Sequence, residues 1–130
     1  PARAKHDDER VLIFRNMMLD ERDMDIADVV WNYFTAVAER WPIAWDATGS
    51  GLVLNKTNGF RALMRFLRDV YLYIGQPGEV PKKEDFLSVI GKVNLTDDYF
   101  TLVNYKPGTS GESALYNDLV KNSPIAATRK

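Results

Sequence analysis

Apolar residues recur at every third or fourth position along most of this chain, which is the pattern of amphipathic helices. The strongest stripe predicts a helix over Thr57–Ile74, and its apolar members are Phe60, Leu63, Met64, Leu67, Val70, Tyr71 and Ile74. A second stripe predicts a helix over Ile26–Trp41. Asp25 is expected to cap that helix and Pro42 to end it, because the residue before a proline is driven out of helical geometry.

Weaker stripes of the same spacing predict the other helices. They cover Asp7–Leu19, Glu79–Lys92 and a last segment after the Pro-Gly-Thr-Ser-Gly loop, whose apolar face is Leu115, Tyr116 and Leu119. In that last segment Thr109 and Glu112 have the spacing of a capping box, which predicts that their side chains satisfy the first turn. A short helix that begins near Asp97 also fits the pattern.

The chain carries no pattern typical of a β-sheet. No run shows the sustained alternation of a half-buried strand, and neither an internal repeat nor a low-complexity stretch is present. The sequence therefore predicts an all-α fold, organised as a single compact domain of five or six helices over residues 1–122. Residues 123–130 are expected to form a polar tail.

Composition excludes several classes of chemistry. The 130 residues include 15 aromatic side chains, which is far too many for a solvated coil. The absence of cysteine excludes disulfides, cysteine zinc sites and cysteine nucleophiles. The single histidine, His6, excludes the usual histidine-rich metal centres. We therefore expect no metal and no cofactor, and the sequence indicates no catalytic residue.

Charge is balanced over the whole chain but not along it. The formal net charge is -1, yet residues 51–92 carry seven lysines and arginines against four aspartates and glutamates. This segment is able to present a modest basic patch, although an ordinary mixed surface fits the same counts.

Features that direct a chain to a membrane or across one are missing from the sequence. No apolar run approaches the roughly 20 residues that span a bilayer, and no signal peptide is visible. We therefore expect a cytoplasmic protein without a membrane partner. The chain begins with Pro1 rather than methionine, which we interpret as the start of a piece of a longer protein.

Three arginines of the Thr57–Ile74 helix form the most suggestive charged group. Arg61, Arg65 and Arg68 are spaced by four and three residues, which puts them on one helix face opposite the apolar stripe. Such a face is able to neutralise nucleic-acid phosphates. A solvated face without a partner has the same pattern, so both interpretations stay open.

Two loops that open helices are candidate anion sites. Lys56 and Thr57 stand at the start of the predicted Thr57–Ile74 helix, and Thr109 and Ser110 stand at the start of the last predicted helix. Free amides at a helix N-terminus attract phosphate. The first loop superficially resembles a P-loop, but Asn55 precedes the lysine where that motif needs glycine. An ordinary helix start and a tight turn with a cap are the alternatives.

Aromatic residues gather in the second predicted helix and just after it. Trp31, Trp41 and Trp45, together with Tyr33 and Phe34, are able to stack on nucleic-acid bases. Their helical spacing favours a place in the core instead.

Three stretches, in this order, resemble a known family. They are Asn32-Tyr33-Phe34 leading to Trp41-Pro42-Ile43-Ala44-Trp45, then Lys56-Thr57-Asn58-Gly59-Phe60-Arg61-Ala62-Leu63, and finally Tyr99-Phe100 followed by Pro107-Gly108-Thr109-Ser110-Gly111. Together they resemble the C-terminal helical part of DGQHR-domain proteins, a family that includes relatives of DndB, a regulator in DNA phosphorothioation systems. The Asp-Gly-Gln-His-Arg signature itself is absent from this chain.

The resemblance implies a helical accessory domain of a bacterial protein whose name-giving domain lies upstream. That upstream domain is then the expected partner, with DNA and self-association as further candidates. The first hypothesis is therefore a non-enzymatic accessory or interaction domain linked to DNA modification or its regulation. The alternative is a nucleic-acid-binding module that uses Lys56, Thr57, Arg61, Arg65, Arg68, Thr109 and Ser110.

Overall fold

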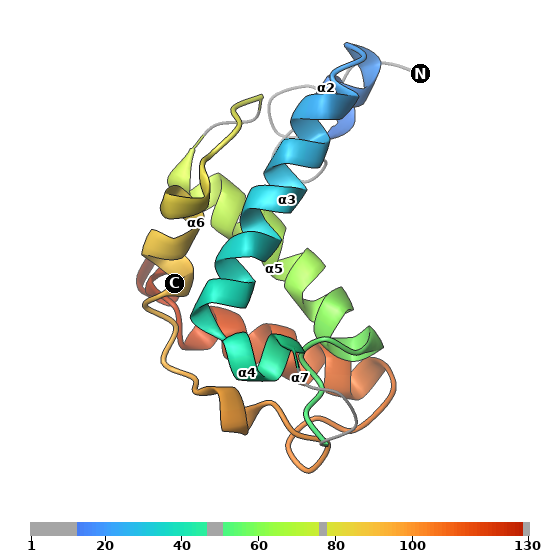
Figure 1. Ribbon diagram of the computed structural model, residues 1–130, viewed down its shortest axis with the longest axis vertical. Helices are drawn as coiled ribbons and strands as arrows, with labels where there is room; N and C mark the ends of the chain where they lie inside the picture. Colours follow the sequence, from blue (N-terminus) through green and yellow to red (C-terminus); the bar gives the residue numbers. More distant parts are fainter. Residues whose placement is uncertain (1–12, 47–50, 76–77, 129–130) are drawn as a thin grey trace.

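The computed structural model describes residues 13–46, 51–75 and 78–128, and these residues form an all-α fold (Figure 1). Their α-helices are α2 (Arg15–Leu19), α3 (Asp23–Arg40), α4 (Pro42–Asp46), α5 (Thr57–Ile74), α6 (Lys83–Ile90) and α7 (Thr109–Lys121). Two 3-10 helices, η1 (Asp97–Tyr99) and η2 (Pro124–Thr128), complete them. The predicted fold class is confirmed, with six α-helices in the described residues.

The two long helices organise the molecule. Figure 1 shows α3 running diagonally along one side, with α5 crossing behind it. Helix α5 packs mainly against α7, and α3 packs mainly against α6. The predicted Asp7–Leu19 helix is described only from Ile13 onwards, and there it is the short helix α2, which packs on α3.

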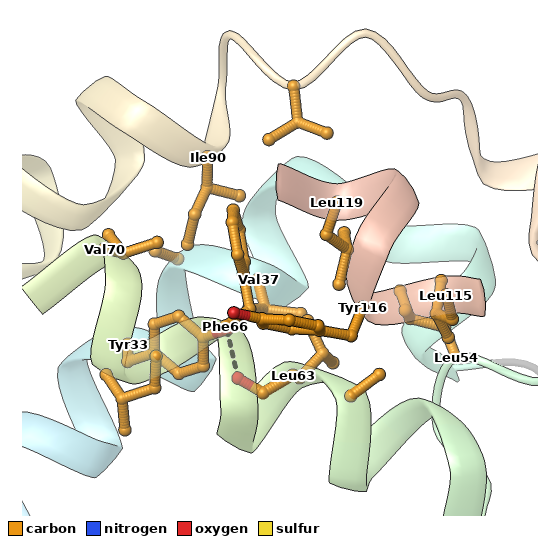
Figure 2. Close-up of a cluster of buried hydrophobic side chains, with 14 of the residues drawn as sticks. Tyr33, Val37, Leu54, Leu63, Phe66, Val70, Ile90, Leu115, Tyr116 and Leu119 are labelled. Atoms are coloured by element: carbon orange, nitrogen blue, oxygen red, sulfur yellow. Dashed lines mark hydrogen bonds between the residues drawn. The ribbon is translucent and has the colours of Figure 1, made fainter. Parts of the chain in front are cut away.

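The core lies where α5 meets its neighbours (Figure 2). Leu63, Leu67, Val70 and Tyr71 of the predicted stripe are fully or almost fully buried, whereas Phe60 is 48% exposed. Tyr33 of α3 is also fully buried, and its hydroxyl donates a hydrogen bond of 2.6 Å to the carbonyl of Leu63. Burial of the hydroxyl raises the pKa of Tyr33 well above its ordinary value, and the negative charge of Asp69 makes a smaller contribution in the same direction.

The predicted caps of two helices are wrong. Helix α3 begins at Asp23, so Asp25 lies inside it, where its carboxylate accepts a bond of 2.7 Å from the guanidinium of Arg22. Helix α7 follows Gly108 and has no side-chain cap at that residue, so Thr109 and Glu112 form no capping box. Glu112 instead faces arginines of α5, because the packing of α7 on α5 brings those charges within reach.

The segment after α3 turns sharply and starts a new helix. Pro42 ends α3 as predicted, and the aromatic corner that follows is itself the short helix α4. A residue far along the chain caps it. The carboxylate of Asp97 accepts the backbone N–H groups of Ile43 and Ala44 at 2.8 and 3.0 Å. The Trp41 indole donates to the Leu95 carbonyl at 2.9 Å. This bond holds the segment that contains Asp97 against the end of α3.

Replacing Asp97 with alanine is expected to destabilise the fold by about 1 kcal/mol, because two amides of α4 lose their acceptor. Asp97→Asn is the matched control, since asparagine keeps an acceptor oxygen and caps helices about as well. Urea unfolding of both variants measures the difference. Equal stability of the alanine variant and the unmodified protein would contradict the cap.

Residues 123–128 were expected to belong to a polar tail, and they instead continue the fold. Pro124–Thr128 form η2, and Ile125 is buried in the core. The Ser123 hydroxyl is buried too, and it donates to the Val120 carbonyl at 2.7 Å. The segment Pro124–Thr128 is mostly apolar, and it packs on α7 and α5 with Ile125 buried.

The aromatic cluster is only partly core. Trp41 and Tyr33 are fully buried, as predicted. Phe34 is half-buried and lies in a stack between Trp45 and Phe60, with both pairs of ring centroids 5.4 Å apart. Trp31 is 74% exposed, so its prediction as a core residue is wrong.

Candidate functional site

Helices α5 and α7 begin in the same way. Each opens with a threonine, then a small polar residue, then a glycine: Thr57-Asn58-Gly59 in α5 and Thr109-Ser110-Gly111 in α7. In both helices the residue before the threonine makes no side-chain capping bond. The first-turn amides of both helices are therefore left without a side-chain cap in the described part of the chain.

The glycine at the third position of each helix lets the preceding loop fold tightly onto the first turn. A Cβ on Gly59 would lie 2.1 Å from the carbonyl oxygen of Leu54, and one on Gly111 would lie 1.7 Å from that of Lys106. In both cases the carbonyl belongs to the residue five positions earlier. No other residue type fits such an approach, so both loops have a shape that only glycine permits.

A groove of about 550 Å³ lies between these two helix starts. It is lined by Lys56, Thr57, Arg61 and Thr109 from the predicted set. The other lining residues are Gly51, Leu52, Val53, Asn58, Leu102, Tyr105, Pro107 and Gly108. The structure thus brings four of the seven predicted binding residues to one place, although Thr109 is far along the sequence from the other three.

The remaining three predicted residues do not line the groove. Arg65 turns to α7, where its guanidinium lies 3.5 Å from the Glu112 carboxylate and 4.2 Å from the centre of the Tyr116 ring. Arg68 lies 4.0 Å from a carboxylate oxygen of Asp69. Ser110 is exposed outside the groove lining. The arginine stripe is therefore divided, with Arg61 at the groove and the other two engaged with α7 or with a neighbouring acid.

No protein-family model, curated protein or solved structure matches this chain. The resemblance to DGQHR-domain proteins therefore stays a prediction.

Basic side chains, helix N-termini and apolar residues all border the groove. Each helix N-terminus carries the equivalent of roughly half a positive charge. Lys56 and Arg61 add two full charges, and Glu112 lies 3.9 Å from the guanidinium of Arg61, which offsets part of them. The acid lies beside the groove and is not among its lining residues. An anion that enters would therefore meet cations and free amides first.

The apolar walls come from two segments that are distant in the sequence, and the pairing of these segments was not predicted. Leu52 pairs with Thr101 in an antiparallel bridge, and Leu102 follows Thr101 in the chain. Tyr105 is buried, and its hydroxyl donates a bond of 2.7 Å to the Asp118 carboxylate. Burial first, and that bond second, raise the pKa of Tyr105, so this side chain stays neutral at the groove. Only the fold brings these segments together, so no sequence signal could have found them.

The described residues contain neither a metal-binding cluster nor a membrane-spanning helix. Within residues 13–46, 51–75 and 78–128, no three acidic or histidine side chains gather to hold a metal ion. No helix in this part of the chain has the length and apolar character to cross a bilayer. His6 and the Gly49-Ser50 start of the P-loop-like segment lie outside the described residues.

Proposed function

We propose that this chain is an accessory binding domain that holds a phosphate of a nucleic-acid strand in the groove between the first turns of α5 and α7. One observation carries the proposal. Two uncapped helix N-termini open onto a single groove whose lining includes both Lys56 and Arg61. Helix N-termini favour anions, and cations beside them add charge-assisted hydrogen bonds.

Each lining group has a distinct part in binding. Lys56 supplies a compact charge, and Arg61 supplies a planar fork that matches two phosphate oxygens. The threonines at the start of each helix, Thr57 and Thr109, supply hydroxyls at the same level as the free amides. The apolar walls contact the sugar or base that follows the phosphate. A groove of about 550 Å³ has room for a nucleotide as well as its phosphate.

Binding to a nucleic acid is expected to involve few phosphates. Of the three arginines only Arg61 lines the groove, so the binding does not use a continuous basic face along α5. With about two cations involved, the affinity should fall by about tenfold between 50 and 200 mM salt. This weak salt dependence suits a single unpaired nucleotide better than a long duplex contact.

The proposal agrees with the role that the resemblance implies. A domain that secures one phosphate would assist a DNA-linked upstream domain without acting on the DNA itself. The first hypothesis, an accessory domain of a DGQHR-like protein, and the nucleic-acid alternative then describe the same molecule.

Titration of the protein with a fluorescent single strand and a matched duplex, each at about 50 and 200 mM salt, tests the proposal. We expect Lys56→Ala and Arg61→Ala each to weaken binding by about tenfold, because each removes a charge-assisted contact. Arg68→Ala removes the same charge on the same helix outside the groove, and Lys92→Ala removes an exposed charge elsewhere. Both controls should bind as the unmodified protein does.

Three results would overturn the proposal. One is no binding at the lower salt concentration. Another is an Arg61→Ala variant that binds as tightly as the unmodified protein. The third is an Arg68→Ala variant that loses as much affinity as Arg61→Ala, since binding would then follow the whole arginine stripe.

A further inference from the structure

The outward face of α3 carries a second surface, which is unrelated to the groove. Met24, Asp28, Trp31 and Thr35 follow one another at spacings of four, three and four residues, and all are exposed. Met24 is 75% exposed and Trp31 is 74% exposed. They lie two helical turns apart, about 10 Å along the axis. Figure 1 shows the start of α3 at the end of the molecule opposite α7.

Internal packing does not explain the position of Trp31. Its ring makes no aromatic or cation–π contact with the described residues, whereas Phe34, three residues later, is stacked on both faces. A tryptophan that stays exposed adds little to the stability of the folded state. Tryptophan is the residue type most enriched among those that dominate protein interfaces, and methionine adapts its shape to a partner.

The charge around these two side chains is acidic. Helix α3 carries four acids and a single arginine, and Arg40 is turned inward to the carbonyls of Val93 and Leu95. Asp25 is paired with Arg22, and Glu39 lies 3.3 Å from the ammonium of Lys83. This leaves Asp28 exposed on the outward face and Asp23 exposed at the first residue of the helix, with no ion pair to either among the described residues.

We propose that this face of α3 binds a basic amphipathic helix of a partner protein. The partner's apolar residues would cover Met24 and Trp31, and its lysines or arginines would pair with Asp23 and Asp28. An apolar centre flanked by carboxylates is the complement of a helix with an apolar stripe and basic flanks. Nucleic acid is excluded from this face, because the carboxylates repel phosphate.

The test uses synthetic peptides as probes. The first is an amphipathic helical peptide with leucines on one face and lysines along its flanks. The second has glutamates in place of the lysines, and the third has the residues of the first in scrambled order. Calorimetry measures binding, and acrylamide quenching reports the exposure of tryptophan. We expect only the first peptide to bind and to protect a tryptophan from quenching.

Variants then locate the site. Trp31→Ala is expected to weaken binding by at least about tenfold, because a central tryptophan dominates such contacts. Asp28→Asn should weaken it by a smaller factor. Val103→Ala and Glu84→Gln change an exposed apolar and an exposed acidic residue elsewhere and should have no effect. Since Trp31 is exposed, its variant should unfold at the same temperature as the unmodified protein.

Several outcomes would overturn the proposal. Equal binding of the scrambled peptide would mean that charge alone attracts it, and equal binding of the acidic peptide would mean that charge does not matter. Undiminished binding to Trp31→Ala would place the peptide elsewhere. Sedimentation of the protein alone gives the last check: a dimer that Trp31→Ala dissociates would make a second copy of this chain the occupant instead.

Discussion

Replacing Gly111 with alanine is expected to destabilise the fold by about 3 kcal/mol, the upper part of the usual range for overpacked sites. The new Cβ would lie 1.7 Å from the carbonyl oxygen of Lys106 and 2.8 Å from its carbon. Both are backbone atoms, so relief requires the whole loop to move. In an unobstructed helix the same change stabilises the protein by nearly 1 kcal/mol. A loss of stability in Gly111→Ala would therefore show that the Lys106 carbonyl obstructs the new side chain.

Gly59 at the start of α5 should behave in the same way. An alanine Cβ there would lie 2.1 Å from the Leu54 carbonyl oxygen and 2.3 Å from that of Val53. Its cost should be comparable, because the obstacle is again backbone. The two glycines thus fix both loops that border the groove, and either change should also weaken the proposed phosphate binding.

Urea unfolding measures these losses, and Ser110→Ala is the matched control. Ser110 also lies in the first turn of α7, but it is exposed, so its change should stay within about 0.5 kcal/mol. A Gly111→Ala variant that is as stable as the unmodified protein would show that the loop does not need to lie against the first turn. If the Gly111→Ala variant is stable and also keeps its affinity for the nucleic acid, the shape of the groove is not needed for the proposed binding.

Local patterns predicted the elements whose residues interact mainly within one helix. The bounds Thr57–Ile74 coincide with α5, because a continuous stripe on one face of a helix leaves little choice of where it is buried. The interpretation failed for Trp31, although helix geometry already argued against it. At about 100° per residue, Trp31 lies roughly 160° from the centre of the apolar stripe that Val29, Tyr33 and Val37 form, on the side that faces solvent.

Contacts between distant segments account for what the sequence could not predict. Asp97 caps α4 from more than 50 positions away. Glu112 pairs with arginines of α5 instead of capping the first turn of α7. The candidate site divides along the same line. Lys56 and Thr109 were predicted from local loop chemistry, whereas the meeting of their two loops in one groove is a product of the packing of α5 on α7.

Stability is expected to fall steeply above about pH 10, the ordinary pKa of tyrosine. Burial raises the pKa of Tyr33, Tyr71 and Tyr105 in the folded protein. The Asp69 charge adds to this for Tyr33, and the Asp118 hydrogen bond adds to it for Tyr105, whereas the Gly78 amide offsets part of it for Tyr71. All three hydroxyls therefore keep their protons in the folded state after they have lost them in the unfolded state.

The sign follows from proton counts. Above about pH 10 the unfolded chain binds fewer protons than the folded one, so the free energy of unfolding decreases as pH rises. A tyrosine that is protonated in the folded state and ionised in the unfolded state contributes about 1.4 kcal/mol per pH unit, so three contribute at most about 4 kcal/mol per unit. Below the ordinary pKa of tyrosine this contribution is complete and independent of pH.

Urea unfolding at several values between about pH 8 and pH 11 measures this slope, and tyrosinate absorbance follows the ionisation directly. Tyr33→Phe is the informative variant. It lowers stability at every pH, because the Leu63 carbonyl loses its buried donor, yet it should also make the alkaline slope shallower by roughly a third. Lysine deprotonation in the same range affects both proteins equally, so the difference in slope isolates Tyr33. An identical slope would contradict the prediction. It would mean that the Tyr33 hydroxyl ionises as readily in the folded protein as in the unfolded chain, despite its burial in the core.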